Sequence, residues 1–197
     1  NQGSYLVKVS SEAGTTISPA AQLTVIVPPA NTYAAIVMAD RPAAYWRLGE
    51  TGSAIALDYA GGYDGLYLDG AVQGQPGALK DDADTAAGFD GFSGMVEVPH
   101  AAALNGAQHT IECWAKVGGG SGFYRSPLTS RAGSPERGYI FYATPADIWE
   151  HWTGQGPVGG WNGIAGPAVV YDEWTYLVAT YDGTTKRFYV NGVEAGS

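Results

Sequence analysis

Residues 174–192 read Trp-Thr-Tyr-Leu-Val-Ala-Thr-Tyr-Asp-Gly-Thr-Thr-Lys-Arg-Phe-Tyr-Val-Asn-Gly. Aromatic and β-branched residues dominate 174–182 and 185–190, as is typical of strands, and Asp182-Gly183 separates the two runs. This pattern predicts an antiparallel hairpin. Asn191-Gly192 is a second turn signal, so we expect a further strand after it. Because the sequence stops at Ser197, we expect it to be a piece of a longer multidomain chain.

The same kind of signal recurs outward from this hairpin toward the N-terminus. Short strand patterns separated by glycine-rich turns are typical of a sandwich or jelly roll and not of alternating strands and helices. They fall at residues 44–48, 65–68, 86–89, 95–98, 110–116, 128–131, 139–143, 148–153, 168–170, 174–180 and 186–190. One helix is predicted over 33–40, where Tyr33, Ile36 and Val37 share a face, and Arg41-Pro42 ends it.

Composition supports this all-β prediction and excludes several classes of protein. Twenty-nine glycines and eleven prolines among 197 residues are too many for a helical bundle, and 45% apolar residues argue against disorder. The net charge of −9 repels phosphate backbones, which argues against a nucleic-acid partner. No apolar run reaches the ~20 residues of a membrane span. Cys113 is the one cysteine, and we interpret it as a small buried apolar residue.

The N-terminal segment predicts a β-hairpin with strands over 5–10 and 21–27, closed by Pro28-Pro29. The runs Gly-Ser-Tyr-Leu-Val-Lys-Val-Ser-Ser-Glu-Ala-Gly (3–14) and Ala-Gln-Leu-Thr-Val (21–25) resemble the last two strands of a bacterial immunoglobulin-like domain. We therefore expect three parts: residues 1–28 as the end of such a domain, 29–32 as a linker, and 33–197 as the main body.

The main body resembles the bacterial laminin-G-like, concanavalin A-type jelly roll, a β-sandwich, over residues 33–197. The motifs that carry the resemblance are Ala-Tyr-Trp-Arg-Leu-Gly-Glu (44–50), Leu-Asp-Tyr-Ala-Gly-Gly-Tyr-Asp-Gly (57–65), Gly-Gln-Pro-Gly-Ala (74–78), Ala-Gly-Phe-Asp-Gly (87–91), Val-Glu-Val-Pro (96–99), Thr-Ile-Glu-Cys-Trp (110–114), the 174–183 segment and Tyr-Val-Asn-Gly (189–192). The family's closing strand is absent from this sequence. The resemblance implies an extracellular or cell-surface protein.

Because the superfamily includes glycosidases, catalysis has to be considered. Retaining hydrolysis needs two carboxyl groups ~5–5.5 Å apart, which residues i and i+2 of one strand can supply. The sequence has no such array: Glu97 and Glu112 stand alone, and Asp147 and Glu150 are three residues apart. We predict that the protein is not an enzyme.

A structural calcium ion is the one cofactor that the resemblance implies, since some members of the family hold one. Asp58, Asp64 and Asp90 offer carboxylates beside glycine-rich backbone, and calcium prefers such oxygen ligands. The alternative is that these aspartates accept hydrogen bonds from the amides of their own turns.

The candidate ligand site lies in the aromatic cluster around residues 149–162. Aromatic rings stack on the flat C–H faces of sugars, and amide side chains bond to the hydroxyls. Along 148–153, Trp149 and His151 point to one face and Trp152 to the other, so at least one tryptophan belongs to the core. The predicted ligand-binding residues are Trp149, His151, Trp161, Asn162, Tyr124 and Arg125. The alternative is that these aromatic residues pack inside the sandwich.

Three functional hypotheses follow from these patterns. The first is a non-catalytic adhesion or binding module that recognises a glycan or an extracellular protein. The second is a building block of a fibre, stalk or surface layer that self-associates through strand addition by the N-terminal hairpin. The third is an accessory carbohydrate-binding domain of a carbohydrate-active enzyme.

Overall fold

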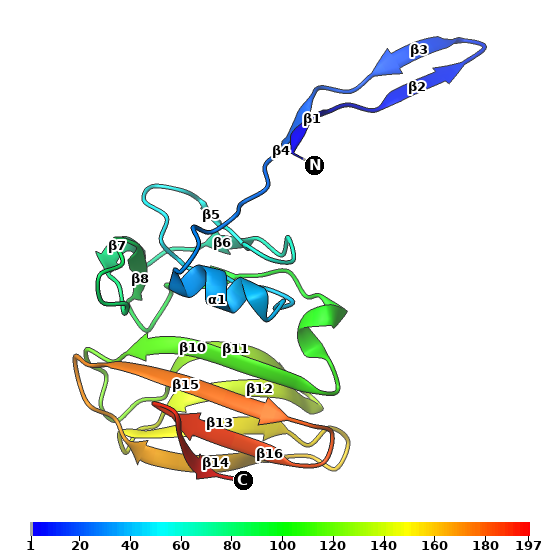
Figure 1. Ribbon diagram of the computed structural model, residues 1–197. Coiled ribbons are helices and arrows are strands. Elements are labelled where there is room, and N and C mark those ends of the chain that lie inside the picture. Colours follow the sequence, from blue (N-terminus) through cyan, green and yellow to red (C-terminus); the bar gives the residue numbers. More distant parts are fainter. Residues whose placement is uncertain (1) are drawn as a thin grey trace. The chain divides into compact units, whose positions relative to one another are not determined.

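A computed structural model describes residues 2–197, which form seventeen strands, one α-helix and one 3₁₀ helix (Figure 1). The chain divides into two units. One contains the chain up to Tyr45 together with Tyr59–Gly61, and the other contains Trp46–Asp58 and Gly62–Ser197. The predicted all-β architecture is confirmed.

The first unit begins with a long hairpin. Its strands are β1 (Gly3–Tyr5), β2 (Lys8–Ser11), β3 (Gly14–Ile17) and β4 (Ala21–Leu23). β2 pairs with β3 and β1 pairs with β4, so the hairpin is a ribbon two strands wide. The prediction of one strand over 21–27 is wrong: Leu23 pairs with Gly3, and Thr24–Val27 have no paired strand among the described residues.

Helix α1 (Tyr33–Ala39) confirms the predicted helix. The Thr32 hydroxyl accepts a hydrogen bond from the Ala35 N–H at 3.2 Å and so caps the helix N-terminus. Arg41 has a left-handed φ of 55° and precedes Pro42, which ends the helix as expected. No helix among residues 2–197 is long and apolar enough to cross a membrane.

Small two- and three-stranded sheets lie between the helix and the sandwich in the sequence. β6 (Gly65–Tyr67) pairs with β5 (Ile55–Ala56) and β9 (Val96–Glu97), and β7 (Ala71–Pro76) pairs with β8 (Thr85–Phe89). The predicted strand over 44–48 is wrong. Only Trp46 forms a bridge, to Asp58, because Leu48 has a φ of 57° that interrupts the extended chain.

Two four-stranded antiparallel sheets form the β-sandwich (Figure 1). The first has the order β10-β15-β16-β17 and the second β11-β12-β13-β14. Their bounds are β10 His109–Lys116, β11 Arg125–Gly133, β12 Glu136–Ala143, β13 Ile148–Gly154, β14 Trp161–Ala168, β15 Trp174–Tyr181, β16 Lys186–Val190 and β17 Val193–Gly196. The 174–190 hairpin is confirmed, and β17 is the strand expected after Asn191-Gly192.

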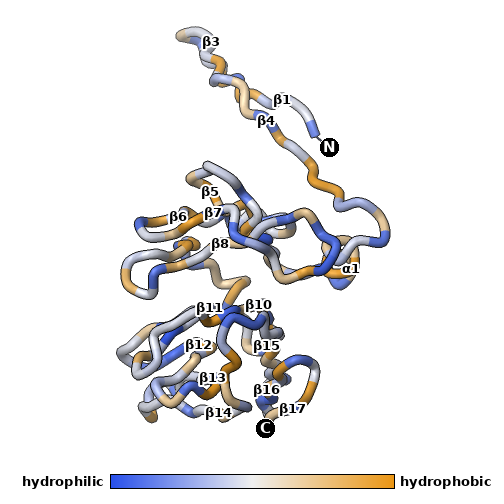
Figure 2. Tube along the Cα trace, turned by 90° about the vertical axis from the view of Figure 1, so that its left-hand side faces the viewer, coloured by the Kyte–Doolittle hydropathy of each residue, from blue (hydrophilic) through white to orange (hydrophobic). Residues whose placement is uncertain are grey.

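The core lies between these two sheets, and hydrophobic residues recur along their strands (Figure 2). Phe141 of the second sheet and Phe188 of the first are fully buried, with ring centroids 5.8 Å apart. Gly166 makes room for this contact, because a Cβ there would lie 2.9 Å from the Phe188 ring. Cys113 packs against the same core, and burial raises the pKa of its thiol to about 12, so the thiol stays protonated.

His151 is the one titratable side chain among the largest fully buried ones. Its ring lies 5.2 Å from that of Phe141, and its Nδ1 has no hydrogen-bond partner. Burial, with a smaller repulsion from Lys186, lowers the pKa of His151 to about 3. The imidazole is therefore neutral in the folded protein at neutral pH.

We predict that this buried histidine makes the fold sensitive to acid. Between pH 6.5 and about 3 the unfolded chain protonates His151 and the folded chain does not, so stability falls as the pH decreases through this window. The loss over this window amounts to at most about 5 kcal/mol. Urea unfolding measured from pH 7 to 4 should show a smaller decrease for His151→Leu than for the wild type. His100→Gln is the control, and an equal decrease in all three proteins would contradict the prediction.

Candidate functional site

The second sheet separates its side chains into a core face and an outer face. In β13, Trp149 and His151 lie on the core face with 1% exposure each, whereas Glu150 and Trp152 lie on the outer face. The prediction that one of the two tryptophans belongs to the core is thus confirmed for Trp149. The assignment of Trp149 and His151 as ligand-binding residues is wrong, because neither reaches the surface.

Trp161 and Asn162, two of the predicted ligand-binding residues, begin β14. Trp161 is half-buried and pairs with Gly154. Asn162 is exposed, and its backbone and side-chain oxygens both accept hydrogen bonds from Lys186 Nζ, at 2.7 and 2.8 Å. Gly163, which follows Asn162 in β14, allows Trp152 to pack closely against this strand.

Trp152 lies flat against the backbone of β14. A Cβ added to Gly163 would lie 2.8 Å from the indole Nε1, so only glycine allows the ring to approach so closely. The indole N–H donates to the Glu150 carboxylate at 2.5 Å. This hydrogen bond and the contact with Gly163 fix the position of the indole on the outer face of the sheet.

Two tyrosines complete an aromatic cluster with Trp152. The ring centroids of Tyr142 and Trp152 are 5.4 Å apart, and Tyr124 lies 4.8 Å from Tyr142 and 5.9 Å from Trp152. Arg131 donates to the Tyr142 hydroxyl at 2.6 Å. We call Tyr124, Tyr142, Trp152, Glu150 and Arg131 the aromatic platform. Tyr124 has the most exposed ring of the platform, at 54% exposure. It is the one predicted ligand-binding residue that belongs to the platform.

Arg125 holds the loop that carries Tyr124. Its guanidinium donates to the carbonyl oxygens of Gly119 and Thr144 and to the Tyr171 hydroxyl, and it forms a 2.7 Å ion pair with Asp147. Hydrogen bonds from Arg125, and then from Ser121 and Tyr171, hold the pKa of Asp147 below its usual value. Arg125 therefore ties together the segments around Gly119, Thr144, Asp147 and Tyr171, which gives this predicted ligand residue a structural role.

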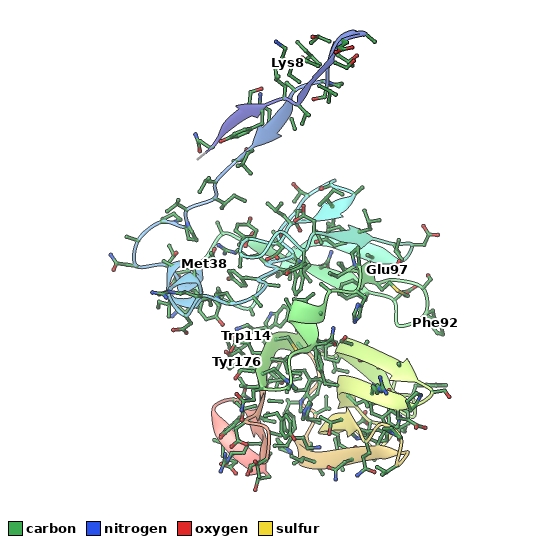
Figure 3. All side chains as sticks on the ribbon, turned by 90° about the vertical axis from the view of Figure 1, so that its right-hand side faces the viewer. Lys8, Met38, Phe92, Glu97, Trp114 and Tyr176 are labelled. Atoms are coloured by element: carbon green, nitrogen blue, oxygen red, sulfur yellow. The ribbon has the colours of Figure 1, made fainter. Side chains whose placement is uncertain are left out.

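The three aspartates predicted to bind calcium do not fit such a site. Asp90 accepts hydrogen bonds from the N–H groups of Phe92, Ser93 and Gly94, which lower its pKa to about 2. These hydrogen bonds match the alternative interpretation, in which the carboxylate accepts from the amides of its own turn. Figure 3 shows Phe92 of this turn pointing outward, and it is 94% exposed.

Asp58 and Asp64 also bond to backbone amides, of Tyr63 and Asp58 respectively. In the acidic loop, Asp82 and Asp84 both pair with Arg47. Within residues 2–197, no three His, Cys, Asp or Glu side chains group so as to hold a metal ion.

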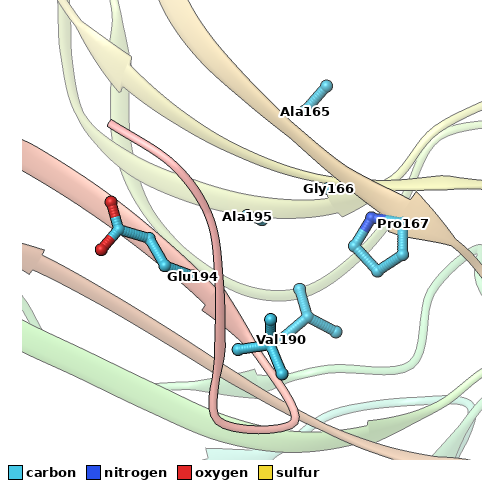
Figure 4. Close-up of a pocket in the computed structure, with 7 residues that line it drawn as sticks. Ala165, Gly166, Pro167, Val190, Glu194 and Ala195 are labelled. Carbon is cyan, nitrogen blue, oxygen red and sulfur yellow. The ribbon is translucent and has the colours of Figure 1, made fainter.

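Two hollows open on the second unit. A small one of about 290 Å³ lies beside β17 and is lined by small and apolar residues such as Ala165, Pro167 and Val190, with Glu194 at its rim (Figure 4). It lacks the converging polar groups of a ligand site. A larger one of about 810 Å³ lies at the end of the sandwich where β10 begins and β15 ends.

The comparisons with known proteins agree with this architecture. A family model of the laminin G type, described as the concanavalin A-like lectin/glucanases superfamily, matches residues 89–197, which is more than half of the chain. Neither the curated proteins nor the solved structures include a significant match. The matched segment contains the complete β-sandwich and the aromatic platform.

We predict that Arg125→Gln lowers the free energy of unfolding by about 2 kcal/mol, since it removes charged hydrogen bonds at a mostly buried position. Arg187→Gln is the matched control. The Arg187 side chain is 42% exposed and its Nε is 3.9 Å from Glu194, so its loss should cost less than about 0.5 kcal/mol. Chemical denaturation of the two variants measures the difference, and equal effects would contradict the structural role of Arg125.

Proposed function

The chain belongs to the concanavalin A-like lectin/glucanase superfamily, and from this membership we propose that it is a non-catalytic glycan-binding module of an extracellular protein. The aromatic platform is the proposed binding surface. The observation that supports it best is the cluster of Tyr124, Tyr142 and Trp152 on the outer face of the sheet.

The platform combines the two kinds of contact that a sugar needs. The exposed Tyr124 ring and the half-buried Trp152 ring present apolar surface to the C–H face of a pyranose. The Glu150 carboxylate and the Arg131 guanidinium lie beside these rings and can bond to hydroxyl groups. Both polar groups are already held by Trp152 and Tyr142, so the surface is largely formed before a ligand arrives.

Glu150 is the single carboxylate of the platform. Retaining and inverting glycosidases both need a second carboxyl group across the scissile bond. This supports binding without hydrolysis. Because Asp90, Asp58 and Asp64 accept hydrogen bonds from amides, we also propose that binding does not need calcium.

We predict that a neutral oligosaccharide identified on a glycan array binds about fivefold more weakly to Tyr124→Ala than to the wild type, since a stacking ring is worth about 1 kcal/mol. The neighbouring Phe123→Ala is the matched control, because Phe123 is 73% exposed and lies outside the cluster. Isothermal titration calorimetry with calcium and with EDTA gives the affinities. Equal affinities of both variants, or loss of binding in EDTA, would contradict the proposal.

A second candidate function is assembly into a fibre or surface layer through the N-terminal hairpin. β2 and β3 pair only with each other, and the apolar side chains of Val7, Val9, Ile17 and Val27 are more than half exposed. A two-stranded ribbon is marginally stable alone, and each of its edges can pair with another strand. We propose a second copy of this chain as the partner.

If the hairpin mediates assembly, the protein should form dimers or larger species as its concentration increases, as sedimentation velocity measures. Val9→Lys should remain monomeric, because a lysine on an edge strand opposes pairing. Val158→Lys places the same charge on another exposed position, in the 155–160 turn, and should behave like the wild type. A monomer at all concentrations would remove this candidate.

A further inference from the structure

Uncompensated positive charge gathers at the larger hollow. Its lining includes Arg131, Arg137, Lys186, His100 and His109, and none of its lining residues is an aspartate or a glutamate. The whole chain has only ten lysines and arginines against nineteen acidic residues. A local excess of basic groups is therefore unexpected in this acidic protein.

Arg131, Arg137 and Lys186 form no ion pair within the described residues. The ion pairs among residues 2–197 involve Arg47, Arg125 and Arg187 only. Lys186 Nζ donates instead to neutral oxygens, those of Asn162 and the Thr153 hydroxyl at 3.2 Å. The nearby Asp182 carboxylate accepts from the N–H groups of Thr184 and Thr185 in its own turn. The charge at the hollow is therefore left for a ligand.

The remaining lining suits a sugar better than a simple ion. His109 lies between two tyrosines, with ring centroids 5.4 Å from Tyr139 and 6.0 Å from Tyr181. Its Nδ1 bonds to the Gly106 carbonyl, which can only accept, so Nδ1 carries the hydrogen. Asn105, Gln155 and Asn162 add amide groups that bond to hydroxyls.

We propose that this hollow binds a carboxylated saccharide, a uronate-containing glycan, as a second site beside the aromatic platform, with which it shares Arg131. Arg137 and Lys186 supply the positive charge for the carboxylate, and the rings and amides contact the pyranose. The volume of about 810 Å³ lies within the usual range of ligand pockets. The hollow is lined by Ser130, Arg131 and Ala132, near the end of β11, whereas Tyr124 precedes the start of that strand.

The test is calorimetric titration with tetragalacturonate, and with its methyl ester as the uncharged form of the same chain. We expect binding of the acid, at least tenfold weaker binding of the ester, and weakening toward about 1 M salt, where charges are screened within about 3 Å. Equal binding of acid and ester would overturn the proposal, as would absence of binding. Equal binding of pentaglutamate would also overturn it, since the site would then select charge without the sugar.

Substitutions of the basic residues test whether tetragalacturonate binds in the hollow. Arg137 is exposed and outside every ion pair of the described residues, so Arg137→Gln should leave the fold intact while it weakens tetragalacturonate binding about tenfold. Lys186→Gln tests the half-buried cation, with thermal melting as the check on folding. Lys80→Gln removes an exposed charge outside the hollow and is the matched control. A loss of affinity in Lys80→Gln equal to that in Arg137→Gln would overturn the assignment.

Discussion

Trp149 and His151 pack between the two sheets against Phe141 and Phe188, and this contact determines which face of β13 meets solvent. Side chains alternate along a strand, so a shift of one residue would exchange the faces and bury the Glu150 carboxylate. The pairing of Phe141 with His151 carries the same alternation into β12. Glu150, Trp152 and Tyr142 reach the outer face because their neighbours fill the core.

The alternation itself could be predicted from the sequence, but the choice between its two faces could not. Trp149 and Trp152 are the same residue type three positions apart, and nothing local distinguishes the core ring from the surface ring. Strand periodicity predicted β10, β12, β15 and β16 closely, because apolar and β-branched residues dominate them. It missed β14, since Gly163 and Gly166 resemble turn residues. Both glycines instead allow close contact, with Trp152 and Phe188 respectively.

Charged residues were harder to assign than aromatic ones, because their partners come from distant parts of the chain. Arg125 bonds to Gly119, Thr144, Asp147 and Tyr171, which belong to several loops that only the fold brings together. Its sequence neighbours show none of this. Asp90 differs, because it accepts hydrogen bonds from the N–H groups of residues at most four positions further along the chain. The turn interpretation of Asp90 was accordingly available from the sequence, whereas the structural role of Arg125 was not.

The distribution of charge limits which ligands the larger hollow can bind. The protein as a whole is acidic, with a net charge of −9, and it repels a polymer of high negative charge density. The cations at the hollow act over a short range, because physiological salt screens charges beyond about 8 Å. Direct contacts in the hollow must therefore contribute more to the binding free energy of a ligand than long-range electrostatic attraction does. A uronate, with one carboxylate on each hydroxyl-rich ring, gains contact from His109, Tyr181 and the amides as well as from Arg137. A nucleic acid has more charge, and it would meet the acidic remainder of the surface before reaching those groups.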